Sequence, residues 1–120
     1  MSLLTKFKEG LGEKLKIPEA PGIYVFDDTL VVKGEEYVRR VASALSSQTR
    51  LKILKYLRSE EIDVGKIAEL IDQSKANASA QIRILEQAKL ITTAYKPGLR
   101  GVKKLCKSNI KCIILLLEET

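Results

Sequence analysis

The spacing of apolar residues predicts the secondary structure of the first third of the chain. An amphipathic helix is expected within residues 1–15, because apolar residues recur there at three- and four-residue steps: Leu3, Leu4, Phe7, Leu11 and Leu15. Two prolines and a glycine then interrupt the chain at residues 18–22. Two short apolar runs, residues 23–26 and 29–33, flank a pair of aspartates and predict a β-hairpin.

Helical periodicity then continues through four segments in a row. The segments cover about residues 35–45, 48–58, 64–71 and 75–88. Residues that favour helix N-caps precede the last three segments: Ser46 and Ser47, Asp63, and Ser74. The predicted buried positions are, in order along the chain, Val38, Val41, Ala42, Leu45, Leu51, Ile53, Leu54, Leu57, Val64, Ile67, Ala68, Ile71, Ala78, Ile82 and Leu85.

After residue 90 the pattern changes from helical to extended. Residues 91–96 and 102–107 flank the loop 97–101, which contains a proline, two glycines and an arginine. This arrangement predicts a second β-hairpin, with a basic tip. The final apolar run, residues 110–117, fits either a strand or a terminal helix, and its isoleucines favour the strand.

The order of the central elements predicts a helix-turn-helix unit. Only two residues separate the helix that ends near residue 71 from Ser74, the cap of the next helix, so a tight turn joins the two. In such a unit the second helix enters the major groove of DNA, and the hairpin that follows is called the wing. The predicted fold class is therefore mainly α with a small β component, a winged helix-turn-helix.

The exposed face predicted for the second helix carries residues suited to base recognition. The face away from the apolar stripe has no acidic residue and presents Lys75, Asn77, Ser79, Gln81 and Arg83. Asn and Gln can bond adenine through two hydrogen bonds, Lys can reach guanine, and Ser can bond to any base. Ala76 and Ala80 are small enough to let the helix approach the groove closely.

The distribution of charged residues along the sequence indicates an anionic partner. The 120 residues carry a net charge of +6. Residues 1–74 are neutral overall, whereas residues 75–111 contain nine basic residues against the single Glu86. A positive excess confined to one third of the chain is typical of a nucleic-acid footprint, although a solvated basic face without a ligand would give the same pattern.

Residues 44–104 resemble the ArsR-type winged helix-turn-helix regulators. The similarity lies in three segments: ALSSQTRLKILKYL at residues 44–57, IAELIDQSKANASAQIRILEQAKLI at 67–91, and the glycine-containing wing KPGLRGVKKL at 96–105. The resemblance implies a dimeric DNA-binding repressor or activator, often released by a ligand. Carried over residue by residue, it implies DNA contacts from Lys75, Asn77, Ser79, Gln81, Arg83, Arg100 and Lys103, and we add Lys96 and Tyr95 of the wing. Packing against the domain is the equally favoured alternative for Tyr95.

The chain departs from that family in three respects. It has no histidine, and residues 64–71 contain no cysteine, so the family's usual metal-sensing sites are absent and we expect no metal and no cofactor. The family's C-terminal dimer helix is replaced by the short segment NIKCIILLLEET, residues 109–120. The first 34 residues have no counterpart in the family.

Two cysteines are too few for a disulfide framework, which fits a reducing compartment. If both of their segments are strands, Cys106 and Cys112 would face each other across a turn at residues 108–109 as a possible redox pair. The commoner explanation for free cysteines is that they are small buried apolar residues.

These observations combine into one prediction of organisation and function. We expect an N-terminal helix and hairpin extension (residues 1–34), a winged helix-turn-helix DNA-binding domain (35–107), and a C-terminal strand or dimerisation tail (108–120). The protein is expected to be a cytoplasmic homodimer that binds specific double-stranded DNA and represses transcription, without a membrane partner and with an unknown effector. Two alternatives stay open, an architectural chromatin-type protein and a protein-interaction module. An enzyme is not expected, because no catalytic set can be assembled.

Overall fold

The helix-turn-helix core is formed by three consecutive helices in the computed structural model, which describes residues 17–117. They are α3 (Gln48–Ser59), α4 (Val64–Leu70) and α5 (Lys75–Gln87), and α2 (Glu35–Leu45) precedes them. The predicted capping residues occupy the N-cap positions. Ser47, Asp63 and Ser74 each accept a hydrogen bond from a backbone N–H three residues later, at 3.0–3.2 Å. These bonds satisfy donors that a helix start leaves without a partner.

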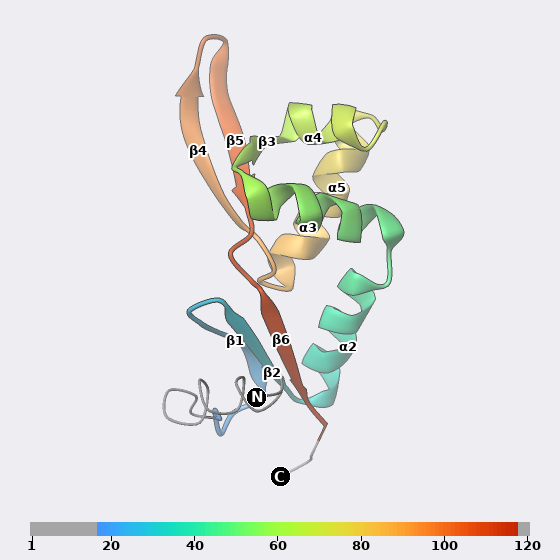
Figure 1. The fold of residues 1–120 in the computed structure, drawn as a ribbon, viewed down its shortest axis with the longest axis vertical. Helices are drawn as coiled ribbons and strands as arrows, with labels where there is room; N and C mark the ends of the chain where they lie inside the picture. The colour runs from blue at the N-terminus through green and yellow to red at the C-terminus, as the bar shows by residue number, and fades with distance from the viewer. Residues whose placement is uncertain (1–16, 118–120) are drawn as a thin grey trace, which may run out of the picture.

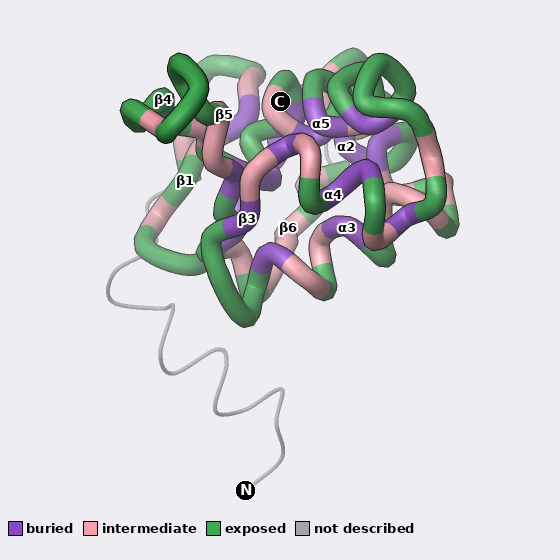
Figure 2. The backbone as a smooth tube through the Cα atoms, turned by 90° about the horizontal axis from the view of Figure 1, so that it is seen from above, coloured by how far each residue is buried: buried purple, intermediate pink, exposed green. Residues whose placement is uncertain are grey.

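One continuous hydrophobic core lies between the helices and the two sheets. The predicted stripe of α5, Ala78, Ile82 and Leu85, is completely buried, as are Ile53 and Leu57 of α3. In Figure 2, buried stretches lie along α3, α4 and α5, whereas the far end of the β4–β5 hairpin is exposed. The core therefore fixes the inner face of α5 and leaves its outer face free.

Two predicted core positions are wrong. Ala42 is exposed, and Ala44 takes the buried place beside Val41, so that the buried face of α2 is rotated relative to the prediction. Leu51 is 47% exposed because it lies in the first turn of α3, on the side that faces an open hollow described below. Periodicity locates an apolar stripe but not the extent of its partner surface.

The predicted N-terminal hairpin is confirmed and joins the C-terminal tail in one sheet. Strand β1 (Gly22–Phe26) pairs antiparallel with β2 (Thr29–Lys33), and β2 pairs in parallel with β6 (Cys112–Leu116). The run at residues 110–117 is thus a strand rather than a helix. Figure 1 shows this sheet at one end of the molecule, beside α2. The helix expected within residues 1–15 lies outside the described residues.

The second sheet contains the wing. Strands β4 (Thr92–Gly98) and β5 (Gly101–Lys107) form an antiparallel hairpin that projects beyond the helices (Figure 1), and β3 (Ile62–Asp63) adds to the other edge of β5. The predicted five-residue loop is shorter in the structure, because Gly98 and Gly101 pair directly and leave two residues at the tip. Gly101 has a φ of 94°, a value that glycine adopts without strain.

Hydrogen bonds link the first sheet to the helical core. The Nζ of Lys89 donates to the carbonyl oxygen of Ile23 at 2.9 Å. At the start of the connection from β5 to β6, the buried Ser108 donates its hydroxyl to the carbonyl of Leu90 at 2.8 Å and its backbone N–H to Leu57 at 3.2 Å. The first sheet and the helix-turn-helix unit therefore share one core.

Candidate nucleic-acid interface

The turn between α4 and α5 sets the direction of α5. Helix α4 ends with two backbone hydrogen bonds, from Asp72 N–H to Glu69 O at 3.2 Å and from Gln73 N–H to Ala68 O at 3.0 Å. Asp72, the first of these two donors, has a left-handed φ of 55°. This is the Schellman pattern, which ends a helix and reverses the chain within two residues. Ser74 then caps α5 immediately, so the turn leaves little freedom in the angle between the two helices.

The outer face of α5 is exposed and carries the predicted polar residues. Lys75, Asn77, Ser79 and Arg83 are exposed, and so are the small residues Ala76 and Ala80. The one acid of the helix, Glu86, lies in its last turn and is engaged by the wing, where Lys104 approaches to 3.6 Å and Thr93 donates its hydroxyl. The N-terminal three turns of α5 therefore present cationic and neutral hydrogen-bonding groups without a competing carboxylate.

Gln81 differs from the other predicted site residues because its side chain already has a partner within the protein. Its Oε1 accepts a hydrogen bond from Nη1 of Arg50 at 2.7 Å, and the residue is half-buried. Bidentate recognition of adenine requires that oxygen together with the amide nitrogen. The structure thus gives Gln81 a role in packing α5 against α3, and only its amide nitrogen lacks a partner among the described residues.

Arg50 is the residue that the prediction of site residues missed. Its guanidinium also donates from Nε to the carbonyl of Ala44 at 2.8 Å and from Nη2 to the carbonyl of Ser43 at 3.0 Å. The single side chain therefore ties the C-terminal end of α2 and the start of α3 to the middle of α5. The signal for it in the sequence is the QTR triplet after the cap of α3, which does not say whether the arginine contacts a loop or a phosphate.

The wing places most of its basic residues at the surface. Lys96 and Lys103 are directly opposite each other in the hairpin, and the exposed Arg100 lies at the tip. Lys96 also forms an ion pair with Glu61 at 3.0 Å. Two like charges facing each other across strands repel, so this pair gains from a nearby anion. The structure therefore keeps Arg100 and Lys103 accessible and partly neutralises Lys96.

Tyr95 of the wing is a surface residue. Its side chain is 70% exposed, and its ring lies 6.0 Å from Nζ of Lys104 on the opposite strand. The side chain therefore does not lie in the hydrophobic core. An exposed tyrosine hydroxyl can donate to a phosphate oxygen, a common kind of contact in protein–DNA complexes.

The two cysteines do not form a pair across one hairpin. Cys106 lies in β5, next to β3 and β4, whereas Cys112 lies in β6 of the other sheet, and both are free thiols. Burial raises the pKa of Cys106 from its ordinary value of 9.0 to about 11, and burial also raises the pKa of Cys112. A raised thiol pKa disfavours the reactive thiolate, which agrees with cysteines that serve as small apolar residues.

Neither a metal site nor a membrane helix is found in the described part of the chain. Within residues 17–117, no group of three or more metal-ligating side chains comes together. No helix in the same range is long and apolar enough to cross a bilayer.

Comparison with known proteins identifies the same region. Residues 45–94 match a family model described as a helix-turn-helix domain, which covers less than half of the chain. No curated protein matches the sequence. The matched segment begins at the last residue of α2 and ends within β4, so it contains α3, α4 and α5 with the turn between them.

Several solved structures share this fold over about three fifths of the chain. A fragment (residues 1–100) of a possible transcriptional regulatory protein from Mycobacterium bovis is 27% identical with a TM-score of 0.54, and the match covers 62% of this chain and 75% of that one. NolR from Sinorhizobium fredii is 26% identical with a TM-score of 0.52, over 61% of this chain and 69% of that one.

A third structure is a homodimeric winged helix-turn-helix DNA-binding domain from M. bovis, a possible ArsR-family transcriptional regulator. It is 27% identical with a TM-score of 0.54, and the match covers 62% of this chain and 65% of that chain. These similarities and the element order confirm the predicted winged helix-turn-helix fold.

Proposed function

We propose that this chain, whose winged helix-turn-helix domain is of the ArsR type, binds specific sites in double-stranded DNA as a homodimer and represses transcription. The observation that carries the proposal is the exposed, acid-free face over the first three turns of α5, next to a basic wing. In this proposal α5 enters the major groove, and the wing contacts the sugar-phosphate backbone.

Within that face, Asn77 is the residue we assign to base recognition. It lies in the first turn of α5, is exposed, and uses only its backbone N–H in the cap of the helix. Its amide can bond adenine through two hydrogen bonds. Lys75, Ser79 and Arg83 flank it on the same surface, and we assign them to bases or phosphates. Gln81 contributes by holding α5 in place through Arg50, with its amide nitrogen available to DNA.

The wing supplies contacts that do not depend on base sequence. Arg100 and Lys103 are exposed on the hairpin, and Tyr95 and Lys96 extend the same surface towards the body of the protein. Each phosphate that a lysine or arginine neutralises releases counterions from DNA. DNA affinity is therefore expected to fall steeply with rising salt concentration.

The test separates base recognition from phosphate contact. After selection of preferred duplexes from random DNA, Asn77→Ala should weaken binding to the preferred site about tenfold to a hundredfold and leave random DNA little changed. Lys103→Ala should weaken both by a similar factor and lower the salt slope by about one unit. Lys55→Ala, an exposed lysine on α3 outside the proposed interface, serves as the control.

Each outcome of this test distinguishes among the functions. If Asn77→Ala and Lys103→Ala lose affinity equally on every duplex, the protein is an architectural DNA-binding protein. If the wild-type protein binds no duplex, or binds with no salt dependence, the winged helix contacts another protein instead of DNA.

A dimer is proposed because one recognition helix covers too few base pairs for specificity in a genome. The homodimeric relative from M. bovis supports it. Two apolar segments are available for assembly: the stripe at residues 3–15, which lies outside the described residues, and the run at residues 113–117, in which Leu115 and Leu117 are exposed. Analytical ultracentrifugation that finds only monomer at micromolar concentration, with and without DNA, would contradict the dimer.

Repression is proposed because occupying a promoter requires no surface beyond the DNA interface. A reporter gene placed behind the selected site should lose expression when the protein is supplied. The Asn77→Ala variant should restore that expression. Increased expression with the wild-type protein would make it an activator.

A further inference from the structure

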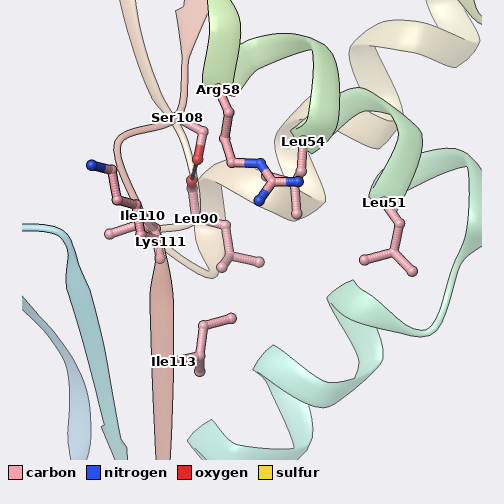
Figure 3. A pocket seen from close by; sticks show the side chains of 8 residues that line it. All are labelled: Leu51, Leu54, Arg58, Leu90, Ser108, Ile110, Lys111 and Ile113. Carbon is pink, nitrogen blue, oxygen red and sulfur yellow. Dashed lines mark hydrogen bonds between the residues drawn. The ribbon is translucent and has the colours of Figure 1, made fainter. Parts of the chain in front are cut away.

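A small hollow lies on the side of α3 that faces β6. Its volume is about 170 Å³. Residues from successive turns of α3 line one side, and residues of the connection between β5 and β6 line the other. The lining side chains, drawn in Figure 3, are those of Leu51, Leu54, Arg58, Leu90, Ser108, Ile110, Lys111 and Ile113. It is distinct from the proposed DNA interface, because none of its lining residues belongs to α5 or the wing.

Five of the eight residues that line this hollow are leucine or isoleucine, and the other three, Arg58, Ser108 and Lys111, are polar. Leu54, Leu90 and Ile113 point towards its centre in Figure 3, and Leu51 closes one side. The hydroxyl of Ser108 is already used, since it donates to the carbonyl of Leu90. The walls thus offer dispersion contacts to an apolar group and no free hydroxyl to compete for water.

The charged groups at its edge are both cationic. In Figure 3 the guanidinium of Arg58 lies beside Leu54, whereas the ammonium group of Lys111 points away from Leu54, Leu90 and Ile113. No acidic residue belongs to the lining. Within residues 17–117, the Arg58 side chain has no hydrogen-bond or ion-pair partner, unlike Arg40, which binds Glu36, and Arg50.

Volume and charge together define the class of ligand. An enclosed cavity of about 150 Å³ lined by Leu, Ile and Phe binds benzene, and this hollow has a similar volume but is open to solvent on one side. A guanidinium presents two parallel N–H donors that match the oxygens of a carboxylate. We propose that this hollow binds a small organic monocarboxylate, with an apolar part the size of a benzene ring against the leucines and its carboxylate on Arg58.

Benzoate is the probe that tests this site on the full chain. We expect saturable one-to-one binding in calorimetry, with a dissociation constant on the order of 0.1–1 mM for a ligand of this size. Methyl groups of Leu54, Leu90 and Ile113 should shift in NMR spectra during the titration. Benzamide has the same ring and no charge, so it should bind at least about tenfold more weakly.

Two variants separate the site from a general charge effect. Arg58→Gln should weaken benzoate binding about tenfold to a hundredfold, because a charge-assisted hydrogen bond is lost. Lys55→Gln removes a positive charge from the same helix, less than one turn away and outside the lining, and should leave the affinity within about twofold. Urea unfolding of each variant checks that the fold is intact.

Three results would overturn the proposal. The first is the absence of saturable benzoate binding by the wild-type protein. The second is equal affinity for benzoate and benzamide, which needs no variant and holds even if Arg58→Gln does not fold. The third is methyl shifts confined to α5 or the wing. Because DNA is absent from all these measurements, failure of this proposal is distinguishable from failure of the proposed DNA-binding function.

Discussion

Arg50 offers the sharpest test of how the proposed recognition helix is held. Its guanidinium donates three hydrogen bonds, to Ala44, Ser43 and Gln81, at 2.7–3.0 Å. The two carbonyl acceptors lie in the last turn of α2, where a positive charge also interacts favourably with the helix dipole. Replacing Arg50 by alanine removes all three bonds and the charge at once.

The magnitude follows from those contacts. A hydrogen bond contributes a net of roughly 0.5–1.5 kcal/mol, so three contribute roughly 1.5–4.5 kcal/mol. The residue is half-buried, and water replaces part of what is lost. We therefore expect Arg50→Ala to lower the free energy of unfolding by about 2–3 kcal/mol. Arg50→Lys keeps the charge but cannot satisfy three acceptors with one ammonium group, and should lose about half as much.

Urea unfolding followed by circular dichroism measures these values, with the exposed Arg39→Ala on α2 as the matched control. A double-mutant cycle of Arg50→Ala with Gln81→Ala isolates the bond between α3 and α5, with an expected coupling of about 1 kcal/mol. A loss below about 0.5 kcal/mol for Arg50→Ala, which is typical of surface sites, would refute the reasoning. A coupling of zero would show that Arg50 does not hold α5 through Gln81.

Three further predictions concern stability. Ser74→Ala should lower the free energy of unfolding by about 1 kcal/mol, because the N-cap of α5 is lost. The same change at Ser79, which lies inside the helix and caps nothing, should cost less, and urea unfolding measures both. Asp72→Gly should raise it by up to about 1 kcal/mol, since glycine accepts the left-handed φ of 55° at that turn, and an unchanged or lower midpoint would contradict this. The raised pKa of Cys106 predicts alkaline destabilisation: below pH 9 both states keep the thiol proton, and between about 9 and 11 only the unfolded state loses it, so stability falls as pH rises through that window. The wild-type protein should therefore lose up to about 2–3 kcal/mol more than Cys106→Ala over this range, and equal losses would show that the thiol is not responsible.

Local signals in the sequence predicted the helices and their starts. Ser47, Asp63 and Ser74 were identifiable because a cap acts on a backbone N–H only three residues away, within the same stretch of chain. The hairpin around Asp27 was equally predictable, since its strands are neighbours in sequence and Asp tolerates the left-handed φ of 53° found there. These elements need no information about distant residues.

Pairings between distant segments were outside the reach of periodicity. The run at residues 110–117 could be assigned to a strand only weakly, because the strand that pairs with it, β2, lies about eighty residues earlier. The two-residue strand β3 is too short to have a period, and only its bonds to β5 define it. The proposed pairing of Cys106 with Cys112 failed for the same reason. Between the two cysteines, the chain is held at Ser108 by hydrogen bonds to the carbonyl groups of Leu57 and Leu90. The strands on either side of Ser108 therefore join different sheets.

Gln81 illustrates why the candidate site was only partly predictable. Its position on the polar side of α5 is correct, and the helical pattern gives no means of distinguishing it from Asn77. The difference arises from α3, which places Nη1 of Arg50 at 2.7 Å from the Gln81 side-chain oxygen, whereas the Asn77 side chain is exposed at the start of the helix. A polar residue on a proposed recognition face can thus be satisfied by its own protein before any DNA arrives. For this chain the consequence is specific: Asn77→Ala should change which base is preferred, whereas Gln81→Ala should weaken binding mainly by loosening α5, in proportion to its loss of stability. If Gln81→Ala changes the base preference without changing stability, Gln81 contacts a base directly.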